Sequence, residues 1–363
     1  MGRYSSRSVR LTASLAVVAF VLLACGRGSG GSAPAQPANA AATNPGGAAP
    51  AAPAATAPPQ LIPAKVAYTT IAASQAPVWV AEAAGYFKEQ GLDVGDMNRV
   101  DPGATLLAAL HNGDVDVAAA GGTSLMLGNL QGLETMIVGS SLDFFEDAIV
   151  ADPSIKSVEG LRGKTIGVSR LKAISDTAAR VALEKLGLRP DEDVSFRGTG
   201  GNAESLAALQ EGSVDAASIS VPALFKAEHL GFLKIVDITA MHIPYATGTY
   251  GATKSTIANR PEVVERVLKA VAQGTARFKS DPEFAAQVVK QYSQIQAPTA
   301  LSKTVEVYQP IFQVDLSPSR EAVQALLDNE ENPAARTATV DDIVDYQFVD
   351  KMRQSGFFDK LPN

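Results

Sequence analysis

Short apolar runs alternate with amphipathic stretches along the chain from about residue 61. The expected elements are a strand at 65–69, a helix at 77–91, a strand at 92–94, a helix at 103–110 and a strand at 115–120. Proline is favoured in the first turn of a helix and glycine just after its end, which places the limits of the first helix at Pro77 and Gly91. This strand–helix alternation predicts a mainly parallel sheet covered by helices on both faces.

The same alternation recurs about 99 residues later, with strands at 165–168, 194–196 and 214–219 and helices at 176–186 and 203–210. Residues 106–122 (LLAALHNGDVDVAAAGG) align with residues 205–221 (SLAALQEGSVDAASISV). Glycine after a helix and aspartate before a strand are common in unrelated turns. Matching elements also precede both copies, however, and this favours two α/β lobes of one architecture.

The pattern becomes mostly helical toward the C-terminus, after an expected strand at 248–252. Apolar residues of the segment that begins at Pro261 recur at helical spacing. Further helices are expected at 281–292, 301–308, 320–327 and 340–353. The tail is expected to pack back on the first lobe. The expected division is therefore a first part of lobe 1 at 61–150, lobe 2 at 151–246, and the completion of lobe 1 with the C-terminal helices at 247–363.

The N-terminus has the pattern of an export signal. Arg3, Arg7 and Arg10 precede an apolar run that ends in Leu-Leu-Ala-Cys at Cys25, and the run is too short for a permanent membrane span. The LLAC sequence resembles a bacterial lipobox, which implies a lipoprotein signal peptide at 1–24 and a lipid on Cys25. A plain signal peptide with an incidental cysteine is the alternative.

A linker is expected between this anchor and the folded body. Residues 26–60 are Gly, Ser, Ala, Pro, Asn, Thr and Gln with one charge, Arg27, so they bury too little apolar surface to fold. Residues 25–60 are thus expected to hold the lipidated cysteine and a disordered tether. Cys25 is the only cysteine, which leaves no disulfide.

Length and charge narrow the function. The 363 residues suit two lobes better than one core. The formal charge of −7 becomes more negative once the three N-terminal arginines are removed, and this argues against nucleic-acid binding. It says little about small anions, which respond to local donors.

Ligands of open parallel sheets sit beyond the carboxyl ends of the strands. That rule selects four segments, 69–77, 121–124, 169–177 and 218–222, which are rich in Ser, Thr, Gly and Gln and poor in acids. They suit neutral or anionic ligand groups. Gly121 and Gly122 permit close approach of the backbone to a ligand, whereas Ser175 and Asp176 are equally explained as helix caps.

A few side chains have two readings each. Arg170 and Lys172 either pair with a sulfonate, phosphate or carboxylate or are simply solvated. Trp79, the only tryptophan, either stacks on a ligand or packs in the core. Phe144 and Phe145 are expected in the core.

Catalytic motifs are weak. The three histidines lack metal-ligand spacing, and no G-x-S-x-G elbow occurs. Residues 198–203 fit G-x-G-x-x-A, but the acid expected after the next strand is missing, so Gly201 and Asn202 are interpreted as a helix start that faces the cleft. No catalytic residue, metal or cofactor is predicted.

Four segments resemble one family: YTTIAASQAPVWVAEAAGYFKEQGLDV, LLAALHNGDVDVAAAGG, LRGKTIGVS and LAALQEGSVDAA, within residues 63–290. They are similar to periplasmic binding proteins for nitrate, sulfonates and taurine, a group that includes binders of the thiamine pyrimidine precursor and has riboflavin binders close by. The resemblance implies a type II periplasmic binding protein fold, in which two lobes joined by two hinge strands close on a ligand. Related thiamine-pyrimidine synthases need a cysteine cluster for iron, which one cysteine cannot supply.

The resemblance also implies a role and a site. The expected role is a monomeric, lipid-anchored extracytoplasmic receptor, periplasmic or on the cell surface, that delivers a sulfonate-, taurine- or nitrate-like anion to the permease and ATPase subunits of an ABC importer. A heteroaromatic ligand, which Trp79, Tyr68 and Tyr245 would favour, is the alternative, and an exported enzyme is a third possibility. The expected ligand contacts are Ser74, Gln75, Trp79, Gly121, Gly122, Thr123, Ser169, Arg170, Asp176, Thr177 and Ser220. Gly122→Val is expected to block binding without affecting folding.

Overall fold

The computed structural model describes residues 60–293, 295 and 297–362. The export signal, Cys25 and nearly all of the linker lie outside them. The strands are β1 Ile62–Pro63, β2 Val66–Tyr68, β3 Leu92–Asp93, β4 Asn98–Arg99, β5 Val117–Ala120, β6 Thr135–Phe144, β7 Asp147–Ala151, β8 Thr165–Val168, β9 Ser195–Gly198, β10 Ala216–Ser220, β11 Leu233–Asp237 and β12 Pro244–Thr253. The helices are α1 Ala76–Ala83, α2 Tyr86–Glu89, α3 Ala104–His111, α4 Gly122–Gly128, α5 Ile174–Lys185, α6 Asn202–Gln210, α7 Ala223–His229, α8 Lys254–Asn259, α9 Pro261–Ser280, α10 Pro282–Ser293, α11 Pro298–Tyr308, α12 Arg320–Asp328, α13 Val340–Ile343 and α14 Gln347–Gln354.

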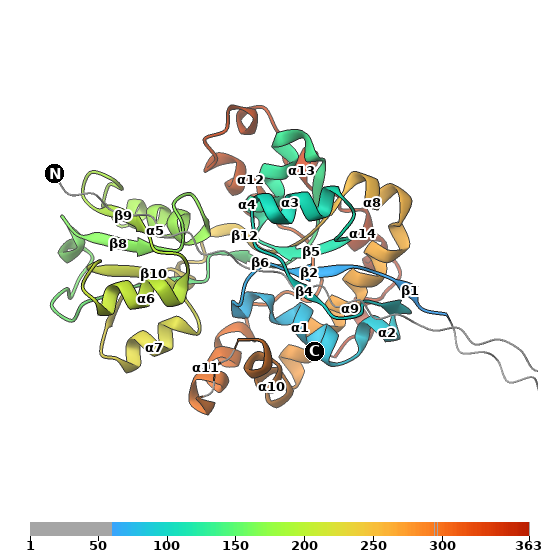
Figure 1. Cartoon of the computed structure of the whole chain (residues 1–363), viewed down its shortest axis with the longest axis horizontal. Coiled ribbons are helices and arrows are strands. Elements are labelled where there is room, and N and C mark those ends of the chain that lie inside the picture. The colour runs from blue at the N-terminus through green and yellow to red at the C-terminus, as the bar shows by residue number, and fades with distance from the viewer. Residues whose placement is uncertain (1–59, 294, 296, 363) are drawn as a thin grey trace, which may run out of the picture. The chain divides into compact units, whose positions relative to one another are not determined.

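Two five-stranded sheets organise these elements. Lobe 1 has the strand order β4-β2-β5-β12-β6, and lobe 2 has β11-β7-β10-β8-β9. Helices cover both sheets, and β6 and β12 run toward lobe 2 as the connection between them (Figure 1). The expected pair of α/β lobes with two hinge strands is therefore confirmed.

Each sheet is mixed rather than mainly parallel. In lobe 1, β2 pairs parallel with β4 and β5, whereas β12 pairs antiparallel with β5 and β6. In lobe 2, β8 pairs parallel with β9 and β10, whereas β7 pairs antiparallel with β10 and β11. The prediction of mainly parallel sheets was wrong for half of the pairings in these two sheets, because β7 and β12 each enter their sheet from the other lobe and run against its neighbouring strands.

The crossings between the lobes fall slightly earlier than the expected boundaries at 150/151 and 246/247. β7 begins at Asp147 and belongs entirely to the second sheet, so the first crossing lies at Phe145 and Glu146. β12 begins at Pro244 and already pairs with Phe144 of β6. Phe145 is buried, as expected, and stacks on Tyr245 at a centroid distance of 4.3 Å, whereas Phe144 is half-buried. The aromatic pair packs the two crossing segments against each other.

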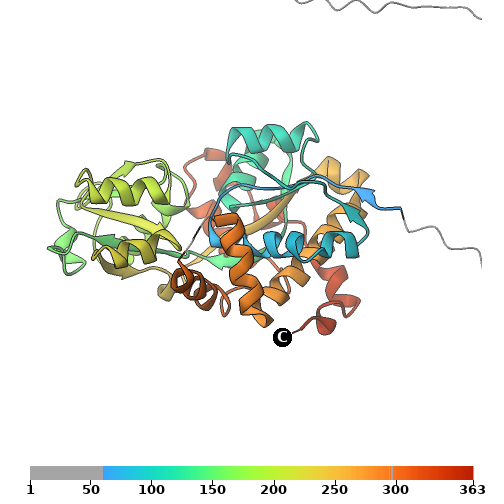
Figure 2. The same cartoon turned by 60° about the horizontal axis from the view of Figure 1, so that its bottom comes forward.

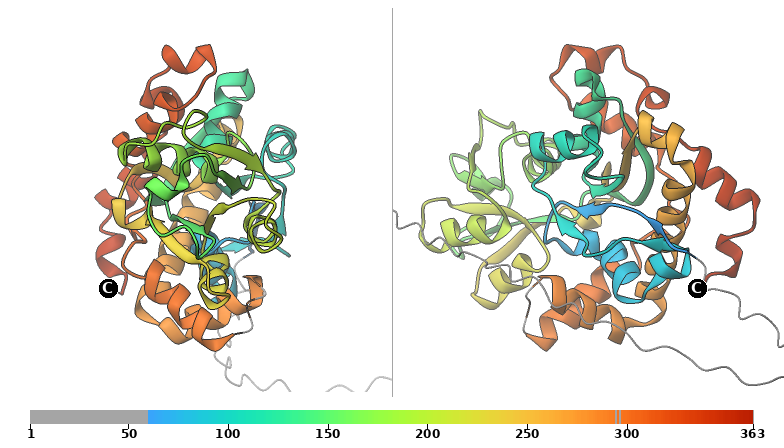
Figure 3. Two further views of the ribbon diagram at one scale, coloured as in Figure 1. Left: turned by 90° about the vertical axis from the view of Figure 1, so that its left-hand side faces the viewer. Right: turned by 45° about the vertical axis from the view of Figure 1, so that its right-hand side comes forward.

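Two predicted helices are each divided in the structure. The helix expected at 77–91 is α1 and α2, separated at Gly85, whose φ of +76° cannot continue a helix. The helix expected at 340–353 is α13 and α14, separated at Val344, whose extended backbone bridges to Ile137 of β6. The tail elements pack on lobe 1, as expected: α10 contacts α1, α12 contacts β12 and α14 contacts β6 (Figures 2 and 3).

The sequence repeat has a structural cause. Asp116 Oδ2 accepts a 2.7 Å hydrogen bond from the backbone N–H of Lys65, just before β2, and its Oδ1 pairs with Arg260 at 2.6 Å. Asp215 Oδ2, at the equivalent place of lobe 2, accepts from the backbone N–H of Thr165 at 2.9 Å. Each aspartate therefore fixes the register at which the central strand meets its parallel neighbour.

The two aspartates differ in burial, which gives a testable difference. Asp116→Ala is expected to lower the free energy of unfolding by about 2–3 kcal/mol, because its carboxylate is only 6% exposed and its removal leaves Arg260 without its carboxylate partner. Asp215→Ala is expected to cost about 1 kcal/mol, because that carboxylate is 38% exposed. Urea unfolding of both variants measures the difference, and equal losses would contradict it.

Within the described range, the structure contains no helix long and apolar enough to cross a membrane.

Candidate functional site

A cavity of about 1300 Å³ lies between the two sheets and receives residues from both lobes. The ends of β2, β4 and β5 contribute one side of it, and the ends of β8, β9 and β10 contribute the other. The starts of α7 and α11 close a third side. Because parallel strands present exposed backbone amides at their carboxyl ends, this is where a two-lobed α/β protein is expected to hold a ligand.

The lobe 1 wall is built from the turn after β2 and the end of β5. Ser74 and Gln75 lie on a single helical turn, are buried at 6% and 4% exposure, and line the cavity. Gly121 ends β5 and is also part of the wall. A Cβ on Gly121 would lie 2.5 Å from Cδ1 of Ile174 in lobe 2, so this glycine allows the lobes to approach.

The lobe 2 wall is held by hydrogen bonds between its own side chains. Ser169 Oγ lies 2.8 Å from Ser175 Oγ at the start of α5. Asn202, at the start of α6, donates through Nδ2 to Ser220 Oγ at 2.7 Å. The interpretation of Gly201 and Asn202 as a helix start facing the cleft is confirmed, since both line the cavity.

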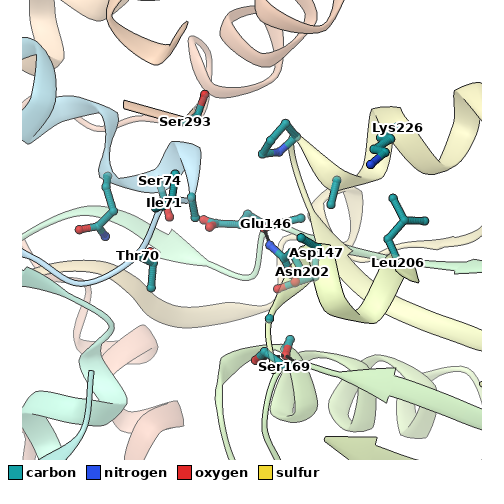
Figure 4. A pocket seen from close by; sticks show the side chains of 18 of the residues that line it. Thr70, Ile71, Ser74, Glu146, Asp147, Ser169, Asn202, Leu206, Lys226 and Ser293 are labelled. Carbon is teal, nitrogen blue, oxygen red and sulfur yellow. Dashed lines mark hydrogen bonds between the residues drawn. The ribbon is translucent and has the colours of Figure 1, made fainter. Parts of the chain in front are cut away.

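Two adjacent carboxyls occupy the inner wall where the chain crosses between the lobes. Glu146 and Asp147 line the cavity and are 8% and 4% exposed. In Figure 4, the Glu146 side chain reaches toward Ser74. Burial, reinforced by the neighbouring Asp147, raises the pKa of Glu146 to about 8, and burial alone raises the pKa of Asp147 to about 7.

The groups around Glu146 only partly offset its burial. The hydroxyls of Ser74 and Tyr308 lie near enough to lower the pKa of Glu146. No described residue, however, meets hydrogen-bond geometry with its Oε2, nor with Oε1 of Gln75 or the hydroxyl of Tyr308. No cationic side chain of the described residues acts on either carboxyl. Glu146 Oε2 and Gln75 Oε1 are therefore buried acceptors without donors, whereas the Tyr308 hydroxyl beside Glu146 is a buried group that could itself donate.

The structure brings six of the eleven expected ligand residues to the cavity. They are Ser74, Gln75, Gly121, Ser169, Arg170 and Ser220. Trp79 is not among them: it is fully buried in the core of lobe 1 and stacks on Tyr292 at 5.1 Å. Of its two readings, core packing is the correct one.

The other four expected residues lie behind the walls. Thr123 donates to, or accepts from, the Tyr245 hydroxyl at 3.0 Å, and Thr177 lies next to the same hydroxyl. Asp176 accepts from the backbone N–H of Lys172 at 2.8 Å and from Arg180 at 2.9 Å, so it serves as a structural anchor at the start of α5.

Gly122 is buried in a tight helix–strand contact. A Cβ there would lie 2.6 Å from the carbonyl oxygen of Ala246 and 2.8 Å from Cδ1 of Leu326. The expectation that Gly122→Val spares folding is therefore wrong, because the new side chain would collide with the backbone of β12 rather than with a ligand.

The other charged and aromatic candidates also divide into side chains that line the cavity and side chains that contact other residues instead. Arg170 lines the cavity and is exposed, whereas Lys172 pairs with Glu331 of the tail. Tyr68 and Tyr245, which would favour a flat ring, pack against Trp79 and Phe145. Phe225 is the aromatic side chain of the cavity lining, beside His229. The described residues hold no group of three or more metal-ligating side chains.

Sequence reasoning missed Glu146 and Asp147, because it placed the first crossing four residues later and judged the cleft segments poor in acids. The available signal was the acidic pair within the apolar run FFEDAIVA, where charged residues are rarely buried without a purpose.

Known proteins share this fold. The alkanesulfonate-binding protein SsuA from Xanthomonas axonopodis pv. citri, bound to MOPS, superposes with a TM-score of 0.64 at 18% identity over 79% of this chain and 99% of its own. The periplasmic nitrate-binding protein NrtA from Synechocystis PCC 6803 gives 0.68 at 12% identity over 84% and 92%. At these identities the likeness establishes the periplasmic binding protein fold.

Sequence relatives point to the same group. The riboflavin-binding protein RibY of Chloroflexus aurantiacus is 28% identical over 223 residues, which cover 60% of this chain and 62% of RibY, less than two thirds of its length. The taurine-binding periplasmic protein of Escherichia coli is 28% identical over 237 residues, 62% of this chain and 69% of its own. The family described as NMT1/THI5 like matches residues 72–285, more than half of the chain. The suspected resemblance is confirmed, and the chain belongs to the NMT1/THI5-like family.

Proposed function

We propose that this protein is the solute receptor of an ABC importer, which captures a small ligand between its lobes and presents it to the permease and its ATPase. The observation that carries this proposal is the cavity between the two sheets, lined from both sides by strand ends. RibY, the taurine-binding protein and SsuA, which all bind small ligands, support it.

Hinge closure is the expected working motion. Among the residues that the structure describes, only the crossings at Phe145–Glu146 and ahead of Pro244 connect the lobes covalently. A ligand that contacts Ser74 on one wall and Ser220 on the other gains contacts in the closed state that are absent in the open one, and so shifts the equilibrium toward closure.

Attachment and location complete the proposal. A lipid on Cys25 and the tether at 26–60 would hold the receptor at the outer face of the membrane, as a monomer, close to its permease. The LLAC sequence that precedes residue 26 and the periplasmic relatives support this placement.

The ligand class has two candidates from the relatives. An anion such as an alkyl sulfonate or nitrate is supported by the cations that line the cavity, Arg99, Arg170, Lys226 and Lys303. A heteroaromatic ligand is supported by RibY and by the size of the cavity, although the aromatic residues expected to stack on it are occupied in the core.

A receptor and an exported enzyme predict different outcomes with the same purified protein. Thermal-shift screening against sulfonates, nitrate, aminopyrimidines and flavins is expected to find a ligand that stabilises the fold by about 2.7 kcal/mol at 100 times its Kd. Small-angle scattering should then show a smaller radius of gyration, and mass spectrometry should recover the ligand unchanged. Recovery of a chemically altered product would contradict the receptor function.

A further inference from the structure

The carboxyls of the inner wall differ from a nearby carboxyl that has a structural role. Asp143, at the end of β6, accepts from Ser140 Oγ at 2.5 Å, Gln313 Nε2 at 2.9 Å and the backbone N–H of Ser319 at 2.7 Å. Glu146, three residues later and more deeply buried, has an Oε2 that meets hydrogen-bond geometry with no described residue, and the donors nearest to the carboxyl are the hydroxyls of Ser74 and Tyr308. Buried acceptors without donors are rare in proteins and need a partner.

A second unsatisfied acceptor lies in the cavity lining. Oε1 of Gln75 also lacks a donor among the described residues, although the side chain is 4% exposed and lines the cavity. The other buried polar residues of the lining all carry hydroxyls, which can donate or accept: Thr69, Ser74, Ser175, Ser220 and Thr247. A ligand that places hydrogen-bond donors in the inner part of the cavity would therefore satisfy these buried acceptors.

The charged side chains of the cavity differ in burial. Its cationic side chains are all exposed, at the mouth: Arg99, Arg170, Lys226, Lys303 and, when protonated, His229. The remaining acids of the lining, Asp101, Glu204 and Glu228, are also exposed, whereas Glu146 and Asp147 are buried. An anion pushed to the inner wall would meet two carboxyls, while a cation there would meet no repulsion from a near neighbour.

We propose that Glu146 and Asp147, with Gln75, form an inner subsite that binds a protonated nitrogen group of the ligand, an ammonium or an amidinium. This assignment rests on the receptor function proposed above and specifies its ligand. The anionic or polar end of the same ligand then lies outward, toward Arg170 and Lys226. The ligand is a small zwitterion or an amino-substituted heteroaromatic cation rather than a simple anion.

Burial of Glu146 and Asp147 determines how their protonation changes when a cationic ligand binds. Without a cation nearby, a buried carboxyl retains its proton near neutral pH, as the raised pKa of Glu146 indicates. A ligand cation favours the ionised form, so binding releases a proton from the carboxyl to the solvent. The N–H groups of the ligand then donate to the acceptors that the protein leaves unsatisfied.

Two matched pairs of probes test the subsite by calorimetry. Taurine and isethionate differ in an amine against a hydroxyl, and 4-amino-2-methylpyrimidine differs in the same way from its 4-hydroxy analogue. In at least one pair, the amine is expected to bind at least 30-fold more tightly, which is typical of a desolvated charge pair. Repetition at pH 7 in two buffers of different ionisation enthalpy is expected to reveal net proton release for the amine.

Variants separate the subsite from a structural effect. Glu146→Gln and Asp147→Asn keep the shape of the side chains and are each expected to weaken amine binding at least 10-fold, and Glu146→Gln should abolish proton release. Glu211→Gln removes an exposed acid on lobe 2 and should change neither.

The outcomes are distinct for the two proposals. Isethionate, or another anion without an amine, that binds as tightly as its aminated partner and closes the lobes overturns the subsite and leaves the receptor function standing. Full affinity for the amine in both Glu146→Gln and Asp147→Asn also overturns it. A failure of every probe to bind, with no compaction by scattering, counts against both.

Discussion

Gly274→Ala is expected to lower the free energy of unfolding by about 3 kcal/mol, although alanine is the better helix former by about 1 kcal/mol. Gly274 lies in the middle of α9, where this long helix packs on α1. A Cβ there would lie 2.4 Å from the carbonyl oxygen of Pro77 and 2.8 Å from the backbone nitrogen of Ala81. These are main-chain atoms and cannot rotate away, so the two helices must separate and their buried apolar contacts loosen.

A second glycine provides the control. Gly198→Ala at the end of β9 adds a methyl group whose nearest neighbour is the Cα of Arg170 at 3.7 Å, an ordinary contact. Its free energy of unfolding should change by less than about 1 kcal/mol. Urea unfolding followed by circular dichroism measures both variants. A Gly274→Ala protein as stable as Gly198→Ala would mean that α1 and α9 do not approach as closely as the structure shows.

Local sequence patterns predicted the repeating half of the fold well. The strand at 165–168 and the helices expected at 103–110 and 203–210 fall within a few residues of the observed elements. The ends of these elements depend on glycines and polar capping residues that are adjacent in the sequence, so they can be predicted from the local sequence alone. No neighbouring residue in the sequence indicates that position 274 must be glycine, because the backbone atoms that exclude a side chain there belong to α1, 190 or more residues away in the chain.

The strands that join the lobes were the hardest to predict. The typical turn residues Gly139, Ser140, Ser141 and Asp143 lie inside β6, whereas the two residues between β6 and β7 are Phe145 and Glu146, so β6 and β7 could not be separated by pattern alone. The position of Glu146 in the cavity depends on where that stretch crosses between sheets. The fold class predicts which strand ends form the two lobe walls of such a site. The residues of its inner wall depend on where the chain crosses from one sheet to the other, and only the pairing of the strands in both sheets determines that point.

Side-chain direction limited the rest of the site prediction. Ser74 and Trp79 lie five residues apart, after the same strand, yet Ser74 faces the cavity and Trp79 faces the core. The sequence predicts that both residues lie near the end of the strand. Which of them faces the cavity depends on the rotation of α1 about its axis, which is set by its packing against α9 and Tyr292. Residues on a helix start are therefore predicted as a group more reliably than one by one.

The ligand-free protein is expected to lose several kcal/mol of its free energy of unfolding as the pH rises from about 4 to about 8, owing to Glu146 and Asp147. In the unfolded chain these carboxyls titrate near their usual pKa values, 4.5 and 3.8, whereas in the fold their pKa values are about 8 and about 7. Between these limits the folded state holds more protons, so stability falls as the pH rises and levels off above pH 8.

Glu146→Gln isolates the larger part of that effect. Because each pKa unit corresponds to about 1.4 kcal/mol and the pKa of Glu146 rises from 4.5 to about 8, the variant is expected to exceed the wild type by ~5 kcal/mol at pH 9 and to match it closely at pH 4. Carboxyls whose pKa is lowered by ion pairs, such as Asp193 and Glu265, act in the opposite direction but equally in both proteins, so they cancel in the difference. Glu211→Gln controls for the change in net charge. Parallel stability curves for Glu146→Gln and the wild type across this pH range would show that the Glu146 carboxyl is solvated, and would remove the basis for an inner subsite that must be filled by a cation.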